Sequence, residues 1–126
     1  MRILSQNENI NEQMLARLKA EKKVYSYIGL SARSRNLVSG EFSTEKAVKN
    51  FTACLVLVAS DASDNTKKLF RNKCIFYEVP CYEFGTKEKL GHALGKEICA
   101  SLAFTDEGLA NAAIKQLNQE VKECQE

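Results

Sequence analysis

The sequence has little of what marks disordered, secreted or membrane-spanning chains. It contains one proline and six glycines in 126 residues, so we expect no long linker or disordered stretch. The longest apolar run, residues 53–59, is much shorter than the about 20 residues of a membrane-spanning helix. The first residues turn polar at once, unlike the apolar core of a signal peptide. We therefore expect a cytoplasmic protein with no membrane contact.

Cysteine spacing offers neither a disulfide framework nor a metal site. The chain has five cysteines, an odd number, and no two of them are spaced as C-x-x-C. Cys54 and Cys99 lie inside apolar runs, where a free cysteine behaves as a small core residue. This pattern favours a reducing compartment and predicts no bound metal.

Residues for catalysis are also scarce. The one histidine, His92, has no serine or cysteine nucleophile motif beside it. Asp61 and Asp64 follow an apolar run, where α/β proteins often hold ligands, but helix capping explains both more simply. The chain has no phosphate-binding loop and no G-x-G-x-x-G motif. We expect no enzyme and no cofactor.

What the chain does have is an alternation of helical and extended patterns that fits one domain. Apolar spacing predicts a weak amphipathic leader over residues 9–22 and a helix over 24–38 that ends at Ser39-Gly40. Glu41-Phe42 is then expected to be extended, and a helix capped by Ser43 or Thr44 to follow, with Ala47, Val48 and Phe51 inward. Strands are predicted at 53–59, 81–84 and 98–104, and further helices at 64–76, 86–94 and 106–121. A small sheet covered by helices on both faces results.

Positive charge is clustered around Gly40, although the net charge of the chain is only +2. Arg33, Arg35, Lys46 and Lys49 flank this glycine. A helix that begins at such a turn presents free N–H groups and the positive end of its dipole, which can hold a phosphate or a base edge. A solvated helix end is the alternative interpretation. A second basic group, Lys67, Lys68, Arg71 and Lys73, is either a solvated face or an extension of an RNA footprint.

Four segments together resemble a known family. They are residues 24–35, Gly40 with Lys46-Ala47-Val48, residues 55–63, and residues 89–96 with their Leu90-Gly91 pair. In order and spacing they are similar to the ribosomal protein L7Ae family, over about residues 22–120. The resemblance implies an α/β fold, a three-layer α-β-α sandwich with a small mixed sheet of about four strands. Residues 21–126 would form the domain and residues 1–20 a leader.

The resemblance also implies binding of kink-turn RNA, a sharply bent duplex with sheared G·A pairs. The turn and helix start at Gly40–Lys46 would enter the major groove, and the loop 95–98 would cover a flipped-out nucleotide. Asp61 would border the same surface. The expected RNA-binding residues are Arg33, Arg35, Gly40, Glu41, Phe42, Ser43, Lys46, Asp61, Lys96, Glu97 and Ile98. The expected partners are kink-turn or rRNA-like structured RNA and ribosomal or RNA-processing proteins, bound by a monomer.

One position pair departs from the family pattern. Strong kink-turn binders carry Asn-Glu two and three residues after the glycine, where this chain has Phe42 and Ser43. Ser43 retains one hydrogen-bonding group, and Phe42 either stacks on a base or fills the core of a short strand. The alternative function is a protein-interaction adaptor on the same fold. An exposed Phe42 would belong to its contact patch.

Overall fold

A computed structural model of the chain describes the backbone of residues 2–125 and the side chains of residues 12–119. The elements in order are α1 (Arg2–Arg33), β1 (Leu37–Ser39), α2 (Glu41–Lys49), β2 (Leu55–Val58), α3 (Asp64–Tyr77), β3 (Cys81–Glu83), α4 (Lys87–Ala93), β4 (Ser101–Phe104) and α5 (Glu107–Gln125). Three residues lie outside the range whose side chains are described: Ile10 of the predicted leader, Val121 of the predicted last helix, and Cys124.

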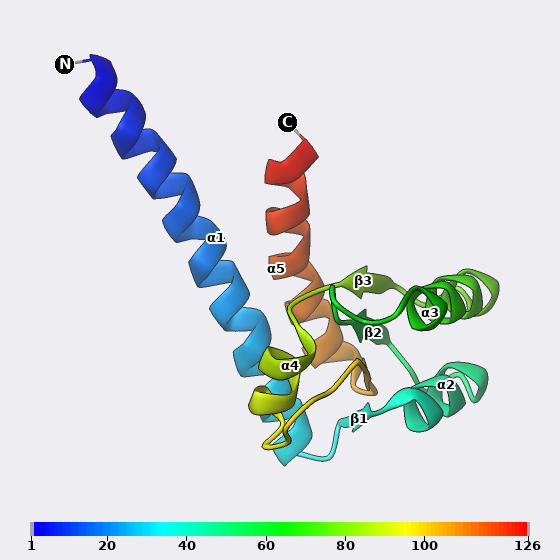
Figure 1. Cartoon of the computed structure of the whole chain (residues 1–126). Helices are drawn as coiled ribbons and strands as arrows, with labels where there is room; N and C mark the ends of the chain where they lie inside the picture. Colours follow the sequence, from blue (N-terminus) through cyan, green and yellow to red (C-terminus); the bar gives the residue numbers. More distant parts are fainter. Residues whose placement is uncertain (1, 126) are drawn as a thin grey trace.

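The four strands form one mixed sheet in the order β1-β4-β2-β3. Strand β4 is antiparallel to both of its neighbours, whereas β2 and β3 are parallel. Figure 1 shows α1, α4 and α5 on one side of this sheet and α2 with α3 on the other. The predicted three-layer sandwich with a small mixed sheet is therefore confirmed.

The two central strands make the core. Every residue of β2 and of β4 is buried, as expected for strands that are covered on both faces. Phe70 of α3 is fully buried in one helical layer, and Val24 and Ile28 of α1 are fully buried in the other. Each such side chain removed from water contributes about 1.5–3 kcal/mol. By contrast, Met14, Leu15 and Leu18, the apolar residues of the predicted leader, are exposed.

The predicted end of the first helix at Ser39-Gly40 is wrong. Helix α1 runs through the predicted leader without a break and ends at Arg33, and residues 37–39 are a strand. The end is made by Arg35, whose φ of 62° is left-handed. The N–H groups of Arg35 and Asn36 donate to the carbonyls of Ala32 and Ser31 at 3.2 and 2.7 Å. This closing motif usually has glycine at the left-handed position, so an arginine there gave no signal in the sequence.

The predictions around the second helix are also partly wrong. Glu41 and Phe42 are not extended, because α2 begins at Glu41 directly after Gly40. Thr44 is therefore one turn inside the helix and buried, and is not a cap. Ala47 and Val48 are buried as predicted. Phe51 instead follows the helix in a left-handed conformation and is 78% exposed.

The remaining helix starts agree with the capping residues in the sequence. Ser63 and Thr86 accept hydrogen bonds from the backbone at the starts of α3 and α4, and Asp106 does so at the start of α5. The last predicted strand is shorter than expected, because β4 begins at Ser101 and Ile98 lies in the loop before it. Within the described residues, no helix combines the length and apolarity needed to span a bilayer.

The left-handed Arg35 predicts opposite effects of one substitution at two neighbouring sites. Arg35→Gly should raise the free energy of unfolding by about 0.5–1 kcal/mol, because glycine adopts this conformation without a steric cost. Arg33→Gly should lower it by about 1 kcal/mol, because Arg33 is in the helix. Urea unfolding of the two variants measures both values. Destabilisation by both substitutions would contradict the assigned helix end.

Candidate nucleic-acid interface

The turn at Gly40 leaves the start of α2 open to solvent. Gly40 has φ 92° and ψ 156°, and no side chain caps the helix. The first backbone bond of the helix runs from Thr44 N–H to the Gly40 carbonyl at 3.0 Å, so the amides of residues 41–43 precede the hydrogen-bonded ladder. A Cβ placed on Gly40 would meet nothing within 4 Å. A phosphate or a base edge can therefore approach this backbone closely.

Helices α2 and α3 run parallel, so both of their positive ends lie on this side. At the N-terminal ends, Thr66 donates to the Glu41 carboxylate at 3.4 Å. At the other ends, the rings of Phe51 and Tyr77 are 5.5 Å apart. The positive ends of both helix dipoles thus lie on the same side, where each helix also has a carboxylate in its first turn, Glu41 in α2 and Asp64 in α3.

The loop 95–98 is held against helix α4 by its closing turn. Gly95 is left-handed at φ 73°, and its N–H donates to the His92 carbonyl at 3.1 Å. Lys96 N–H donates to the Gly91 carbonyl at 2.8 Å. A Cβ on Gly91 would lie 2.7 Å from both the Cα and the nitrogen of Ile98. Only glycine at position 91 lets the loop pack this closely on the helix.

The structure brings the Gly40 turn and the 95–98 loop together, as predicted. Lys96 Nζ donates to Ser39 Oγ at 2.7 Å. Gly40 N–H donates to the carbonyl of Ser101, at the start of β4, at 2.9 Å. We call the surface formed by residues 39–46 and 95–98 the turn–loop surface.

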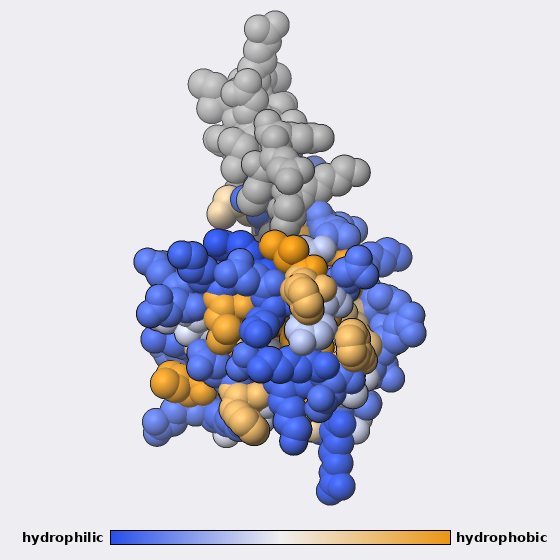
Figure 2. All heavy atoms as spheres, turned by 90° about the vertical axis from the view of Figure 1, so that its right-hand side faces the viewer, coloured by the Kyte–Doolittle hydropathy of each residue, from blue (hydrophilic) through white to orange (hydrophobic). Residues whose placement is uncertain are grey.

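Two large apolar side chains stand out from the turn–loop surface. Phe42 is 78% exposed and Ile98 is 65% exposed. The interpretation of Phe42 as a core residue of a short strand is therefore wrong. Figure 2, which faces the α2–α3 layer, shows hydrophobic side chains on an otherwise largely hydrophilic surface. Phe51, Ile75 and Phe76, at or just after the C-terminal ends of α2 and α3, are also exposed.

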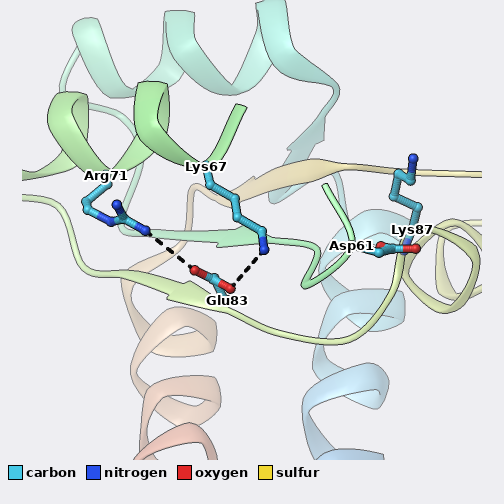
Figure 3. A network of polar contacts seen from close by, with 5 residues as sticks. All are labelled: Asp61, Lys67, Arg71, Glu83 and Lys87. Atoms are coloured by element: carbon cyan, nitrogen blue, oxygen red, sulfur yellow. Dashed lines mark hydrogen bonds and ion pairs between the residues drawn. The ribbon is translucent and has the colours of Figure 1, made fainter. Parts of the chain in front are cut away.

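Asp61 supports this surface from behind. Its Oδ1 accepts a hydrogen bond from the N–H of Lys87, the first residue of α4, at 2.8 Å, and Figure 3 shows the two residues together. The Lys87 carbonyl in turn accepts from Cys99 N–H at 2.9 Å, directly after the loop. Asp61 thus fixes α4 and its loop, a positioning role that the sequence did not indicate.

The cations of the two basic groups differ in their partners. Arg33, Arg35 and Lys46 are exposed and form no ion pair within the part of the chain described here. In the second basic group, Lys67 and Arg71 both approach Glu83, at 3.4 and 3.7 Å (Figure 3). Lys73 lies 4.0 Å from Glu45. Lys49 of the first group pairs with Glu45 at 3.3 Å, whereas Lys68 of the second group is exposed and forms no ion pair among the described residues. Each group therefore retains cations that are available to a phosphate.

The predicted cations differ in where they lie relative to the turn–loop surface. Arg33 lines a groove of about 960 Å³ between α1 and α4, together with Lys96 and Glu97. Lys46 lies on α2 itself. Arg35 lies in the turn after α1. Among the described residues, it forms no hydrogen bond or ion pair with any residue of the turn–loop surface. The described residues include no group of three or more potential metal ligands.

Two contributors to the surface are not evident from the sequence. Ser39, which the sequence places at a helix end, accepts the hydrogen bond that joins the loop to the turn. Gly91 belongs to the Leu90-Gly91 pair of the sequence, but its close packing against the backbone of Ile98 is a tertiary contact. A glycine inside a predicted helix was the available signal, since it destabilises a helix and calls for a packing reason.

Comparison with known proteins identifies the family of the chain. Residues 22–114 match the model of the Ribosomal protein L7Ae/L30e/S12e/Gadd45 family. The chain is 40% identical over 94 residues to the "RNA-binding protein YlxQ" of Bacillus subtilis (strain 168), which covers 75% of this chain and 94% of that protein. It is 40% identical over 75 residues to the YlxQ protein of Enterococcus faecium, covering 60% and 73%.

Two solved structures share the fold. A Bacillus halodurans protein of unknown function is 35% identical with a TM-score of 0.74, covering 76% of this chain and 97% of that one. The Giardia lamblia 15.5kD RNA binding protein is 19% identical with a TM-score of 0.69, covering 82% and 89%. The match to the family model over residues 22–114 and the 40% identity to the Bacillus subtilis protein show that the chain belongs to the ribosomal protein L7Ae/L30e/S12e/Gadd45 family.

Proposed function

We propose that this protein binds structured RNA, and that the turn–loop surface is where it does so. The observation that carries the proposal is the junction of the Gly40 turn with the 95–98 loop through Lys96 and Ser39. The junction puts an open helix start, the exposed Lys46 and two exposed apolar side chains on one surface. Relatives that are 40% identical are named RNA-binding proteins.

The preferred ligand is a sharply bent RNA of the kink-turn type, found in ribosomal or ribosome-associated RNA in the cytoplasm. Bent RNA exposes base edges and splayed-out bases, which an undistorted A-form helix hides. The helix start at Gly40 presents backbone N–H groups that can hold a phosphate or a base edge, with the Glu41 carboxylate beside them. Ile98 supplies an apolar cover for an unstacked base, and Lys46 supplies a phosphate contact.

Phe42 and Ser43 change how such an RNA would be recognised. Their side chains lack the amide and carboxylate that read guanine edges in the strong binders of the family. An exposed phenylalanine can stack on any base, because every base has a π-face. We infer recognition through backbone shape and stacking, with little reading of base identity.

A protein-interaction adaptor is the second candidate function. Exposure of both Phe42 and Ile98 favours it, since exposed apolar side chains mark contact surfaces for proteins as well. The two functions differ in the ligand that Phe42 contacts. RNA binding that is indifferent to Phe42 would favour the adaptor.

Two phenylalanines of equal exposure provide a matched test. Phe42 and Phe51 are both 78% exposed, one in the first turn of α2 and the other just beyond its end. Phe42→Ala should weaken binding of kink-turn RNA by about 1–3 kcal/mol, the usual contribution of one stacked base. Phe51→Ala should leave it unchanged. Fluorescence anisotropy with a labelled RNA measures both. Equal losses, or none from Phe42→Ala, would remove Phe42 from the interface.

A second matched pair uses glycines in helices. Gly91→Ala must push the backbone of Ile98 away, so we expect RNA affinity to fall about tenfold, or 1.4 kcal/mol. Gly108→Ala meets only the flexible Asp106 carboxylate, at 3.3 Å, and should leave RNA affinity unchanged. Circular dichroism confirms that both variants fold. Unchanged RNA affinity in a folded Gly91→Ala protein would show that the loop does not contact RNA.

A further inference from the structure

Two cysteines meet at the C-terminal half of α3, away from the turn–loop surface. Cys74 lies on α3 and is 2% exposed, and Cys81 begins β3 and is half-buried. The turn between them folds back tightly, because Val79 N–H donates to the Cys74 carbonyl at 2.8 Å. Both cysteines line one groove of about 440 Å³. A small molecule that enters this groove lies beside both residues, and Cys81 is the one with the more exposed side chain.

The groove is positively charged around these thiols. Lys67 and Arg71 line it with Glu83, and both cations share that one carboxylate. Figure 3 shows the three side chains between α3 and β3. Two cations for one anion leave a surplus positive charge beside Cys81. Such a partly exposed, electropositive setting is where reactive cysteines are found.

The two thiols are not equivalent. The Cys74 side chain lowers the pKa of Cys81, and the nearby Arg71 lowers it further against the opposing effects of burial and Glu83. The interaction with Cys81, with burial, raises the pKa of Cys74. Cys81 is the more exposed of the two and lies beside the cations, so it is the thiol that ionises more readily.

The other described cysteines lie in settings that suppress reactivity. Burial raises the pKa of Cys54, and the acidic neighbours Glu107 and Asp106 raise it further. Burial also raises the pKa of Cys99, which is 5% exposed. Cys54 is half-buried like Cys81 and has no cysteine partner, so it is a matched internal control.

We propose that Cys81 and Cys74 form a peroxide-reactive pair, in which Cys81 is the attacking thiol and Cys74 the resolving thiol. The Cys81 sulfur attacks one oxygen of a hydroperoxide, the O–O bond breaks, and the other oxygen leaves and takes up a proton. This step converts Cys81 into a sulfenic acid. The Cys74 sulfur then attacks the Cys81 sulfur, its proton goes to the departing hydroxyl, and water leaves. Two thiols and hydrogen peroxide thus become one disulfide and two waters.

The test is to oxidise the full-length Cys124→Ser protein with hydrogen peroxide at neutral pH and follow it by mass spectrometry. The expected product has lost two hydrogens, and peptide mapping should place the disulfide between Cys74 and Cys81. Adding Cys74→Ser should stop the reaction at a sulfenic acid on Cys81, which dimedone traps. A disulfide between any other pair, or no reaction at Cys81, would overturn the proposal.

A second measurement requires no substitution at the pair. Alkylation by iodoacetamide at limiting reagent should label Cys81 about tenfold faster than Cys54 at neutral pH, since a thiolate is the reactive form. The difference should narrow as the pH rises and Cys54 also ionises. Equal rates at neutral pH, or faster labelling of Cys54, would overturn the assignment of Cys81 as the attacking thiol.

Discussion

The hydrogen bonds of β4 are the interaction on which the rest of this structure depends. Strand β4 pairs with β1 on one side and with β2 on the other, and all of its residues are buried. Its start fixes the 95–98 loop, and its Ser101 carbonyl accepts the N–H of Gly40. The two parts of the turn–loop surface are far apart in sequence and meet because both are attached to this strand. Asp61 and Gly91 then set the position of α4 behind the loop.

The layered fold could be predicted from the sequence, whereas the ends of its helices and the turns between its elements could be predicted only in part. The continuous apolar runs of β2 and β4 identify buried strands, and Ser63, Thr86 and Asp106 mark helix starts, because these signals are local. The end of α1 could not be predicted, because Arg35 occupies a conformation that glycine usually signals. Of the candidate site residues, Gly40 and the cations around it also follow from charge clustering, whereas the 95–98 loop came from the family resemblance alone. Their joining through Lys96 and Ser39 is a tertiary contact that spacing does not encode.

In the proposed function, the turn–loop surface supplies a scaffold for entering a groove, but not the groups expected to read it. Gly40, Lys46 and the loop are the parts that the family resemblance predicts, whereas Phe42 offers an apolar side chain where a hydrogen-bonding one is expected. Stacking and phosphate contacts tolerate many sequences, so we expect selectivity to depend on RNA shape. The thiol pair lies apart from this surface and depends on different residues, so the two proposals stand independently.

Recognition of bent RNA is best measured with two RNA duplexes of equal length, one with a kink-turn and one straight. Each labelled RNA is titrated with the 126-residue chain at two salt concentrations. We expect tighter binding to the kinked RNA at both concentrations, with an affinity that falls as salt rises because phosphate contacts contribute. Equal affinity for the two duplexes, or no binding to either, would contradict recognition of bent RNA by this surface.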